Sequence, residues 1–210
     1  SGKIAGCSMI LWSGGEECFT SFQGVQDIEN PSPVNRETIF RIYSMTKPVA
    51  SVALMMLWER GEFDLDDPLS RFIPAFSDMA VYHEGGDPEP AAGAITIRQL
   101  LSHTSGLILP AFSEHPLRDI YIDNGVNGSR SEGTLGDVIG RLAELPLLFH
   151  PGTGWEYSMA TDVVGHLVEV IDGRTFDTFL QEEMFNPLGM VDTGFHLPTE
   201  KIPRFATNYT

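Results

Sequence analysis

The stretch Ser44-Met45-Thr46-Lys47-Pro48, followed by the apolar run 49–58, decides the fold of this chain. The run is apolar on nearly every face, which is typical of a helix buried in the middle of a domain. Pro48 is tolerated only near the first turn of a helix, because the backbone N–H groups there have no partner within the helix. The sequence therefore predicts a central helix that begins close to Ser44 and ends near Gly61.

Ser44 and Lys47 are three residues apart, so their side chains share one face of the predicted first turn. A serine hydroxyl is a poor nucleophile at neutral pH unless a neighbouring base takes its proton. A lysine can be that base where a helix N-terminus and an apolar core favour its neutral form. Ser-x-x-Lys is a degenerate pattern, and the alternative is that Ser44 caps the helix while Lys47 reaches solvent.

Three further stretches follow in order. They are Ile95–Leu107, which ends in Leu-Leu-Ser-His-Thr-Ser-Gly-Leu, then Pro151–Ser158, and then Asn186–Phe195. Together with Ile39–Pro48 they resemble the superfamily of serine β-lactamases, penicillin-binding proteins and family VIII carboxylesterases. Four stretches in the same order, spanning most of the chain, make the resemblance specific.

The resemblance implies an α+β fold of the β-lactamase/DD-peptidase type, an α/β sandwich plus an all-helical domain. Residues 1–62 would form the N-terminal part of the α/β domain, with antiparallel strands and the buried central helix. Residues 63–210 would form the mainly helical domain. The family places a third motif, Lys-Thr-Gly or a variant, on a strand further downstream. We therefore expect the C-terminal strands of the α/β domain to be absent here, and this missing portion to be a partner of the chain.

The resemblance also assigns the chemistry. Ser44 would attack an ester carbonyl, and Lys47 with Tyr157 would act first as the base and then as the acid. The backbone N–H of Ser44 would supply half of the oxyanion hole, with the other half on the missing strand. Leu109 and Phe112 follow the His-Thr-Ser-Gly-Leu segment and are candidate walls of an acyl pocket; ordinary packing explains them equally well.

Met159 separates the possible activities. Class C β-lactamases carry Tyr-x-Asn where this chain has Tyr157-Ser158-Met159, and an apolar side chain at the third position resembles the family VIII esterases. The class A pattern does not fit, since Lys-Thr-Gly is absent from the sequence. We therefore expect a serine carboxylesterase that takes a small-molecule ester. The alternatives are a β-lactamase or D-alanyl-D-alanine carboxypeptidase, an acyltransferase, and a non-catalytic penicillin-binding-like domain.

The remaining elements are predicted from caps and turns. Thr96, Thr134, the pair Thr161-Asp162 and Thr175 are expected to begin helices, and Gly173 to follow the third of these. His103 reads as part of a turn in which Gly106 stops the preceding helix. Residues 110–133 show little periodicity and are expected to form a long surface loop.

Composition excludes several classes of function. The 210 residues carry a formal net charge of −16, which repels phosphate backbones and anionic lipid, so nucleic acid and membrane surfaces are not expected partners. The six histidines show no metal-ligand spacing, so we expect neither metal nor cofactor.

Residues 4–12 and 18–22 read as a hairpin with Cys7 opposite Phe22 and Leu11 opposite Cys18. The cysteines should then be free thiols, consistent with a cytoplasmic location, although periplasmic or secreted locations stay open.

Overall fold

The computed structural model describes residues 4–209, and the chain divides into two compact units. The terminal unit comprises the residues up to Ser44 and those from Met190 onward, and the helical unit runs from Met45 to Gly189. The predicted domains met at residues 62 and 63 instead. The difference arises because the central helix packs against helices of the second unit and therefore belongs to it. The domain boundaries of the whole protein stay a prediction.

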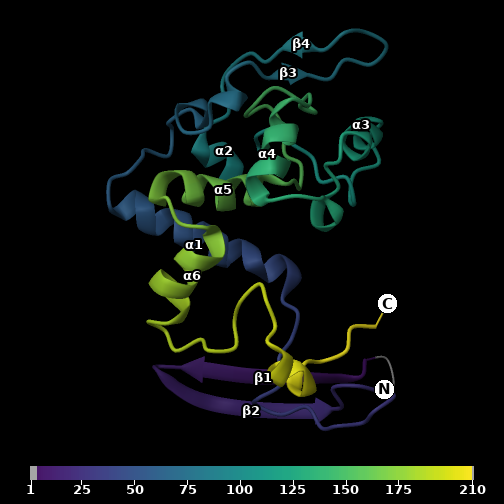
Figure 1. Cartoon of the computed structure of the whole chain (residues 1–210), viewed down its shortest axis with the longest axis vertical. Coiled ribbons are helices and arrows are strands. Elements are labelled where there is room, and N and C mark those ends of the chain that lie inside the picture. The colour runs from purple at the N-terminus through teal and green to yellow at the C-terminus, as the bar shows by residue number, and fades with distance from the viewer. Residues whose placement is uncertain (1–3, 210) are drawn as a thin grey trace. The chain divides into compact units, whose positions relative to one another are not determined.

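A two-stranded antiparallel hairpin dominates the terminal unit (Figure 1). Strands β1 (Gly6–Ser13) and β2 (Glu16–Gly24) are joined through Gly14 and Gly15, which both take the positive φ angles that a tight hairpin turn requires. A bulge between Leu11 and Trp12 shifts the register by one residue.

That bulge explains an error in the predicted register. Cys7 faces Gln23 and not Phe22, and Leu11 faces Phe19 and not Cys18. Beyond the bulge, the pairs Trp12–Glu17 and Ser13–Glu16 follow the predicted register. Both cysteines are exposed free thiols.

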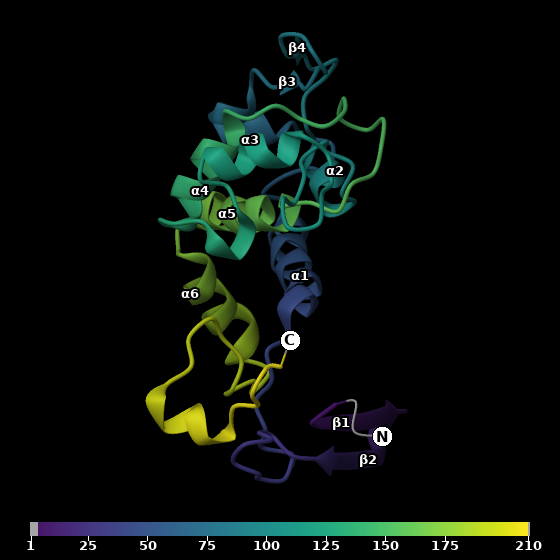
Figure 2. The same cartoon turned by 90° about the vertical axis from the view of Figure 1, so that its right-hand side faces the viewer.

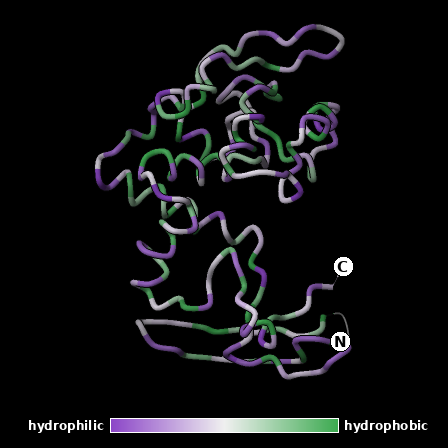
Figure 3. The backbone as a smooth tube through the Cα atoms, in the orientation of Figure 1, coloured by the Kyte–Doolittle hydropathy of each residue, from purple (hydrophilic) through white to green (hydrophobic). Residues whose placement is uncertain are grey.

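The segment 25–39, directly after the hairpin, is joined to the C-terminal segment of the chain by backbone hydrogen bonds, and the hairpin itself carries exposed apolar side chains. Ile39 N–H donates to the carbonyl of Arg204 at 2.8 Å, and Ala206 N–H donates back to Ile39 at 2.9 Å. The sequence predicts a short strand near 38–42 after the loop at Pro31–Pro33, but the structure has a single parallel bridge there, between Ile39 and Phe205. Figure 3 shows hydrophobic residues along the hairpin, and on β1 the side chains of Met9, Ile10 and Leu11 are exposed.

The helical unit is built from short helices around α5. Its helices are α1 (Thr46–Glu59), α2 (Ile97–Leu101), α3 (Leu117–Asp123), α4 (Leu135–Ala143), α5 (Ala160–Asp172) and α6 (Phe176–Leu180). A small antiparallel pair, β3 (Ala80–Val81) with β4 (Glu89–Pro90), lies in the predicted loop 77–93. Helix α5 contacts α1, α2, α4 and α6, and Figures 1 and 2 show it at the centre of this unit.

Helix α1 confirms the predicted start and end of the central helix. Pro48 lies in its first turn, and Gly61 follows its end with a φ of 78°. Its burial is less complete than predicted. Ala50, Ala53, Leu54 and Leu57 are buried, whereas Val52 and Trp58 are exposed, because only one face packs against α5.

Local caps predicted three helix starts correctly and one incorrectly, and one of the correct ones is Thr175, the N-cap residue of α6. Thr96 and Thr134 form capping boxes with Gln99 and Asp137. Helix α5, however, begins at Ala160 and not after Thr161-Asp162. The hydroxyl of Ser158 accepts the Ala160 N–H at 3.3 Å, so an earlier side chain satisfies one of the unpaired donors of the helix start.

The predicted loop 110–133 contains helix α3, which is a correction to the sequence interpretation. Leu117 and Tyr121 are one helical turn apart and both are fully buried. The Tyr121 hydroxyl donates to the carbonyl of Pro146 at 3.0 Å, and burial raises the pKa of this phenol well above its usual value. Tertiary packing therefore stabilises a helix that local periodicity did not reveal.

Residues 103–108 and 148–159 lie side by side although neither segment forms a regular strand there. Four backbone hydrogen bonds join them: Leu148 N–H to Gly106, Gly152 N–H to Thr104, Glu156 N–H to His103, and Met159 N–H to Ile108. Gly106 is required for this approach, since a Cβ at that position would lie 2.3 Å from the carbonyl oxygen of Phe149. The second and third stretches singled out in the sequence are thus fixed to one another.

Across the described residues 4–209, no helix combines the length and hydrophobicity needed to cross a bilayer.

Candidate active site

Lys47 and Tyr157 come together in the helical unit. Lys47 lies in the first turn of α1, and Tyr157 lies in the irregular segment 154–158 that leads into α5. The Lys47 Nζ atom is 4.5 Å from the centre of the Tyr157 ring. An ammonium over an aromatic face is attracted by the negative charge of the ring face. The contact places an amine beside a phenol-bearing side chain, which are two groups that can serve in acid–base chemistry.

His103 closes helix α2 in a conformation unusual for its residue type. Its φ angle is 57°, in the left-handed region. Its N–H donates to the carbonyl of Leu100, and the N–H of Thr104 donates to that of Gln99, the pattern of a Schellman motif. Helix α2 therefore ends at Leu101, with His103 as the left-handed residue after its C-cap, before the predicted stop at Gly106.

The His103 ring is fixed by Ser158. Its Nδ1 accepts the backbone N–H of Ser158 at 3.3 Å and lies 3.0 Å from the hydroxyl of the same serine. Because a backbone amide can only donate, Nδ1 is unprotonated and the neutral ring carries its proton on Nε2. Burial lowers the pKa of His103, and the charge of Lys47 lowers it further.

Aromatic rings surround Tyr157. The His103 ring lies 5.1 Å from it at an interplanar angle of 31°, and the Phe112 ring meets it edge to face at 5.8 Å. Trp155 contacts His103 edge to face at 6.3 Å. Phe112 is 73% exposed, so it stands beside Tyr157 with one side open to solvent.

The other two predicted pocket residues are placed differently. Met159 is only 1% exposed and occupies the N-cap position of α5, so its side chain belongs to the core and not to an open surface. Leu109 is half-buried beside Gly128. Contact of either side chain with a substrate stays a prediction.

Asp162 is a charged residue that the sequence interpretation treated only as a cap. It lies in the first turn of α5, and the surrounding protein raises the pKa of its carboxyl by desolvation, while the Lys47 ammonium opposes that shift. Its side chain is nevertheless exposed, which fits a carboxyl crowded by protein atoms but reached by water. The only sequence signal for Asp162 is that it follows Tyr157 by five residues. That spacing does not by itself indicate that both residues lie near Lys47.

Ser44 is the last residue of the terminal unit and lies in the 3₁₀ turn Tyr43–Met45, which runs directly into α1. The turn begins at Tyr43 with a φ of 42°. Three residues of chain separate Ser44 from Lys47, so their Cα atoms can be no more than about 11 Å apart. The roles of Ser44 as nucleophile and of its N–H as an oxyanion donor stay predictions.

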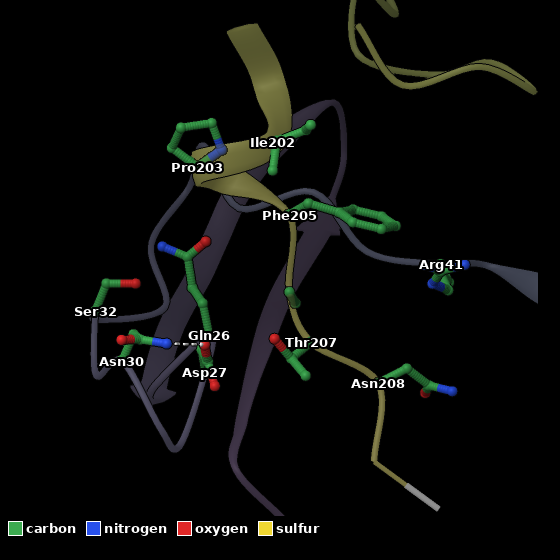
Figure 4. Close-up of a pocket in the computed structure, with 11 residues that line it drawn as sticks. Gln26, Asp27, Asn30, Ser32, Arg41, Ile202, Pro203, Phe205, Thr207 and Asn208 are labelled. Atoms are coloured by element: carbon green, nitrogen blue, oxygen red, sulfur yellow. Dashed lines mark hydrogen bonds between the residues drawn. The ribbon is translucent and has the colours of Figure 1, made fainter. Parts of the chain in front are cut away.

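A separate hollow of about 520 Å³ lies within the terminal unit (Figure 4). Most of its polar groups are already engaged: Asp27 accepts hydrogen bonds from Asn30 and Tyr209, and the Arg41 guanidinium lies 4.7 Å from the centre of the Phe205 ring. Gln26 is 7% exposed, and its Oε1 has no hydrogen-bond partner. The hollow includes none of the predicted site residues.

Metal ligation was not expected from the sequence. In the described part of the chain, no group of three or more histidine, cysteine, aspartate or glutamate side chains could hold a metal ion. The absence of a metal or cofactor in the active protein stays a prediction.

Comparison with known proteins gives a consistent family. The model of the Beta-lactamase family matches residues 1–210. Esterase EstB of Burkholderia gladioli is 35% identical over 210 residues, which are 99% of this chain and 50% of that protein. Monacolin J acid methylbutanoyltransferase of Aspergillus terreus is 36% identical over 172 residues, 79% of this chain and 40% of that protein.

The solved structure of EstCE1, described as a hydrolase with promiscuous acyltransferase activity, superposes with a TM-score of 0.85 at 32% identity. The superposition covers 99% of this chain and 52% of the EstCE1 chain. The chain thus spans about half the length of the relatives it matches, and the match confirms the predicted α+β, β-lactamase-like fold. With its full length matched by the family model, the chain belongs to the Beta-lactamase family.

Proposed function

We propose that the whole protein is a serine hydrolase that cleaves carboxylic esters through an acyl-enzyme on Ser44. The observation that carries the proposal is the Lys47 ammonium over the Tyr157 ring, 4.5 Å from its centre. Relatives named as an esterase and as a hydrolase support the reaction class.

In this mechanism Ser44 Oγ forms a bond to the carbonyl carbon of the ester, and the proton of its hydroxyl passes to the Lys47–Tyr157 pair. Collapse of the tetrahedral intermediate breaks the ester C–O bond, and the pair returns the proton to the departing alkoxide. Water then attacks the acyl-enzyme in the same way and releases the carboxylic acid. Tyr157 is suited to the exchange because its phenolic oxygen can take the proton from Ser44 and give it to the departing alkoxide, while the Lys47 ammonium stabilises the negative charge on that oxygen in between.

A serine-directed phosphonate probe tests the nucleophile. On the whole protein, labelling should fall on Ser44 and be lost in Ser44→Ala. Ser51→Ala is the matched control, because Ser51 lies on α1, the helix that directly follows Ser44, and its loss should leave labelling unchanged. Hydrolysis of p-nitrophenyl butyrate should fall at least about a thousand-fold in Ser44→Ala. A wild-type protein that neither labels nor turns over the ester would instead support a non-catalytic binding domain.

Two substitutions test the acid–base pair. Lys47→Arg keeps a cation over the ring but removes a group that can give up its proton, since arginine stays charged. Tyr157→Phe keeps the ring and removes the hydroxyl. Both should lower kcat by at least about a hundred-fold, the usual size of a general acid–base contribution. Near-normal kcat in Lys47→Arg would assign the base to Tyr157 alone.

Acyl transfer is the second candidate, favoured by the transferase among the relatives and by the description of EstCE1. An acyl-enzyme can be captured by an alcohol in place of water. Adding primary alcohols to the ester assay should then produce a new ester at the expense of the free acid. Nitrocefin in parallel tests the β-lactamase alternative, which the apolar Met159 disfavours.

A further inference from the structure

We infer that His103 is the positioning residue for Tyr157. It accepts hydrogen bonds from the residues directly before and after the tyrosine, and its neutral ring lies against the tyrosine ring. The inference rests on the proposed function, in which Tyr157 handles the proton. His103 entered the sequence interpretation only as part of a turn. The structure gives it three separate contacts with the segment that carries the tyrosine.

The bracket consists of two hydrogen bonds from neighbours of Tyr157. The N–H of Glu156 donates to the carbonyl of His103 at 3.0 Å, and the N–H of Ser158 donates to its Nδ1 at 3.3 Å. Between these anchors, the two rings lie 5.1 Å apart and 31° from parallel. Because residues 154–158 are irregular, these contacts determine where the phenol lies relative to Lys47.

The left-handed backbone of His103 is what makes the bracket possible. Non-glycine residues take this conformation uncommonly, and histidine is, with asparagine and aspartate, among those that take it more often. Here it lets one residue close helix α2 while presenting both its carbonyl and its ring to segment 156–158. A strained conformation kept by a bulky side chain indicates that the side chain has a use at that position.

The ring is also held neutral. Lys47 faces it from α1, and the Ser158 N–H points at Nδ1 from the segment before α5, so a second ring proton would meet a cation and a donor. The rings of Trp155 and Tyr157 also contact the His103 ring. Lys47 therefore remains the cation beside the phenol, and His103 supports the ring without adding charge to it.

Three variants of the whole protein test this role. His103→Gly removes the ring but relieves the backbone strain, so folding should be retained. His103→Asn keeps a residue that tolerates the left-handed conformation, with an Oδ1 able to accept the Ser158 N–H in place of Nδ1. His150→Asn is the matched control: His150 lies on the same segment 148–159 as Tyr157 and its Nδ1 also accepts a backbone N–H, from Ala92 at 3.2 Å, but its Nε2 lies beside Glu89 and not beside the Tyr157 ring.

We expect His103→Gly to lower kcat about a hundred-fold with KM within about two-fold, since a displacement near 1 Å has that effect. His103→Asn should recover to within about ten-fold of wild type, and His150→Asn should match wild type. Thermal unfolding midpoints check that His103→Gly is folded. A folded His103→Gly with kcat within about three-fold of wild type would overturn the inference.

A readout independent of turnover separates this inference from the proposed function. With ¹³C-labelled tyrosine, the Tyr157 phenol should titrate at a different pH in His103→Gly than in wild type, because its position relative to Lys47 has changed. His103→Asn should restore the wild-type titration. Identical titrations in all three proteins would refute positioning, whereas absent labelling at Ser44 with a shifted Tyr157 titration would refute only the hydrolase.

Discussion

The helical unit and the terminal unit are held together in different ways. In the helical unit, α5 is surrounded by other helices, and its core side chains are completely buried. In the terminal unit, the hairpin keeps apolar side chains exposed, and the segment 25–39 that follows it is joined to residues 190–209 by backbone hydrogen bonds and by the Arg204–Glu37 ion pair. Hydrophobic burial thus stabilises the region that positions Lys47 and Tyr157, whereas polar contacts stabilise the region that ends at Ser44.

The largest contrast should come from one leucine in each unit. Leu54 is 0% exposed and Leu11 is 56% exposed. Leu54→Ala should lower the free energy of unfolding by about 2–5 kcal/mol, through lost burial and the cavity left behind. Leu11→Ala should change it by no more than about 0.5 kcal/mol. Urea denaturation measures both, and equal losses would erase the contrast between the units.

Two threonines give a smaller contrast. Thr134 anchors the capping box of α4, and Thr134→Ala should cost about 1 kcal/mol of stability. Thr38 accepts the N–H of Asn35 at 3.0 Å in a turn of the terminal unit, and Thr38→Ala should cost less, under about 0.5 kcal/mol. Thermal melts of the two variants would reveal a reversed order if polar contacts contribute more than burial suggests.

Acid should weaken the ion pairs within the terminal unit. Hydrogen bonds from Arg204 and then Lys201 hold the pKa of Asp192 well below its usual 3.8. Its contribution is therefore complete above about pH 5 and is lost as the pH falls below 3.8 toward the folded-state pKa. Hydrogen exchange at the Ile39 and Ala206 amides should accelerate in that range. Asp192→Asn should show fast exchange already at neutral pH, and an unchanged pH profile in that variant would exclude this ion pair as the cause.

The smallest effect concerns the hairpin thiols. Cys7 and Cys18 are exposed, so replacing either with serine should leave stability within about 0.5 kcal/mol. Ellman's reagent should titrate both thiols in the folded chain at the rate seen in denaturant. Protection of one thiol in the whole protein, but not in this chain, would show which face of the hairpin other residues cover.

Local chemistry predicted much of the fold. Pro48 and Gly61 determined the ends of α1, and Thr96 and Thr134 determined the starts of α2 and α4, because each depends on one residue's backbone or hydroxyl. Helix α3 was missed because the burial of Tyr121 is tertiary.

Longer-range features accounted for the remaining errors. The start of α5 was misplaced because the sequence interpretation used Thr161-Asp162 as the cap. In the structure the Ala160 N–H already donates to the hydroxyl of Ser158, so the helix begins earlier. The hairpin register failed at the bulge, which inserts a residue that alternation cannot show.

The site was predictable only in part. Lys47 and Tyr157 were identified through family resemblance, since 110 residues of chain leave their proximity undetermined by spacing alone. His103 was missed because its importance depends on a left-handed turn and on a partner, Ser158, 55 residues away. Asp162 was interpreted only as a helix cap, because its proximity to Lys47 depends on how α5 packs against α1 and not on local sequence.

The four backbone bonds between 103–108 and 148–159 have a consequence for how the protein would lose its activity on heating. Segments without regular structure usually open piecemeal, but here His103 and Tyr157 lie on opposite sides of one shared set of bonds. Opening should therefore be all-or-none, with the four amides exchanging at a common rate. The tyrosine and its support would be released in a single event, so inactivation would have one sharp temperature and not a gradual decline.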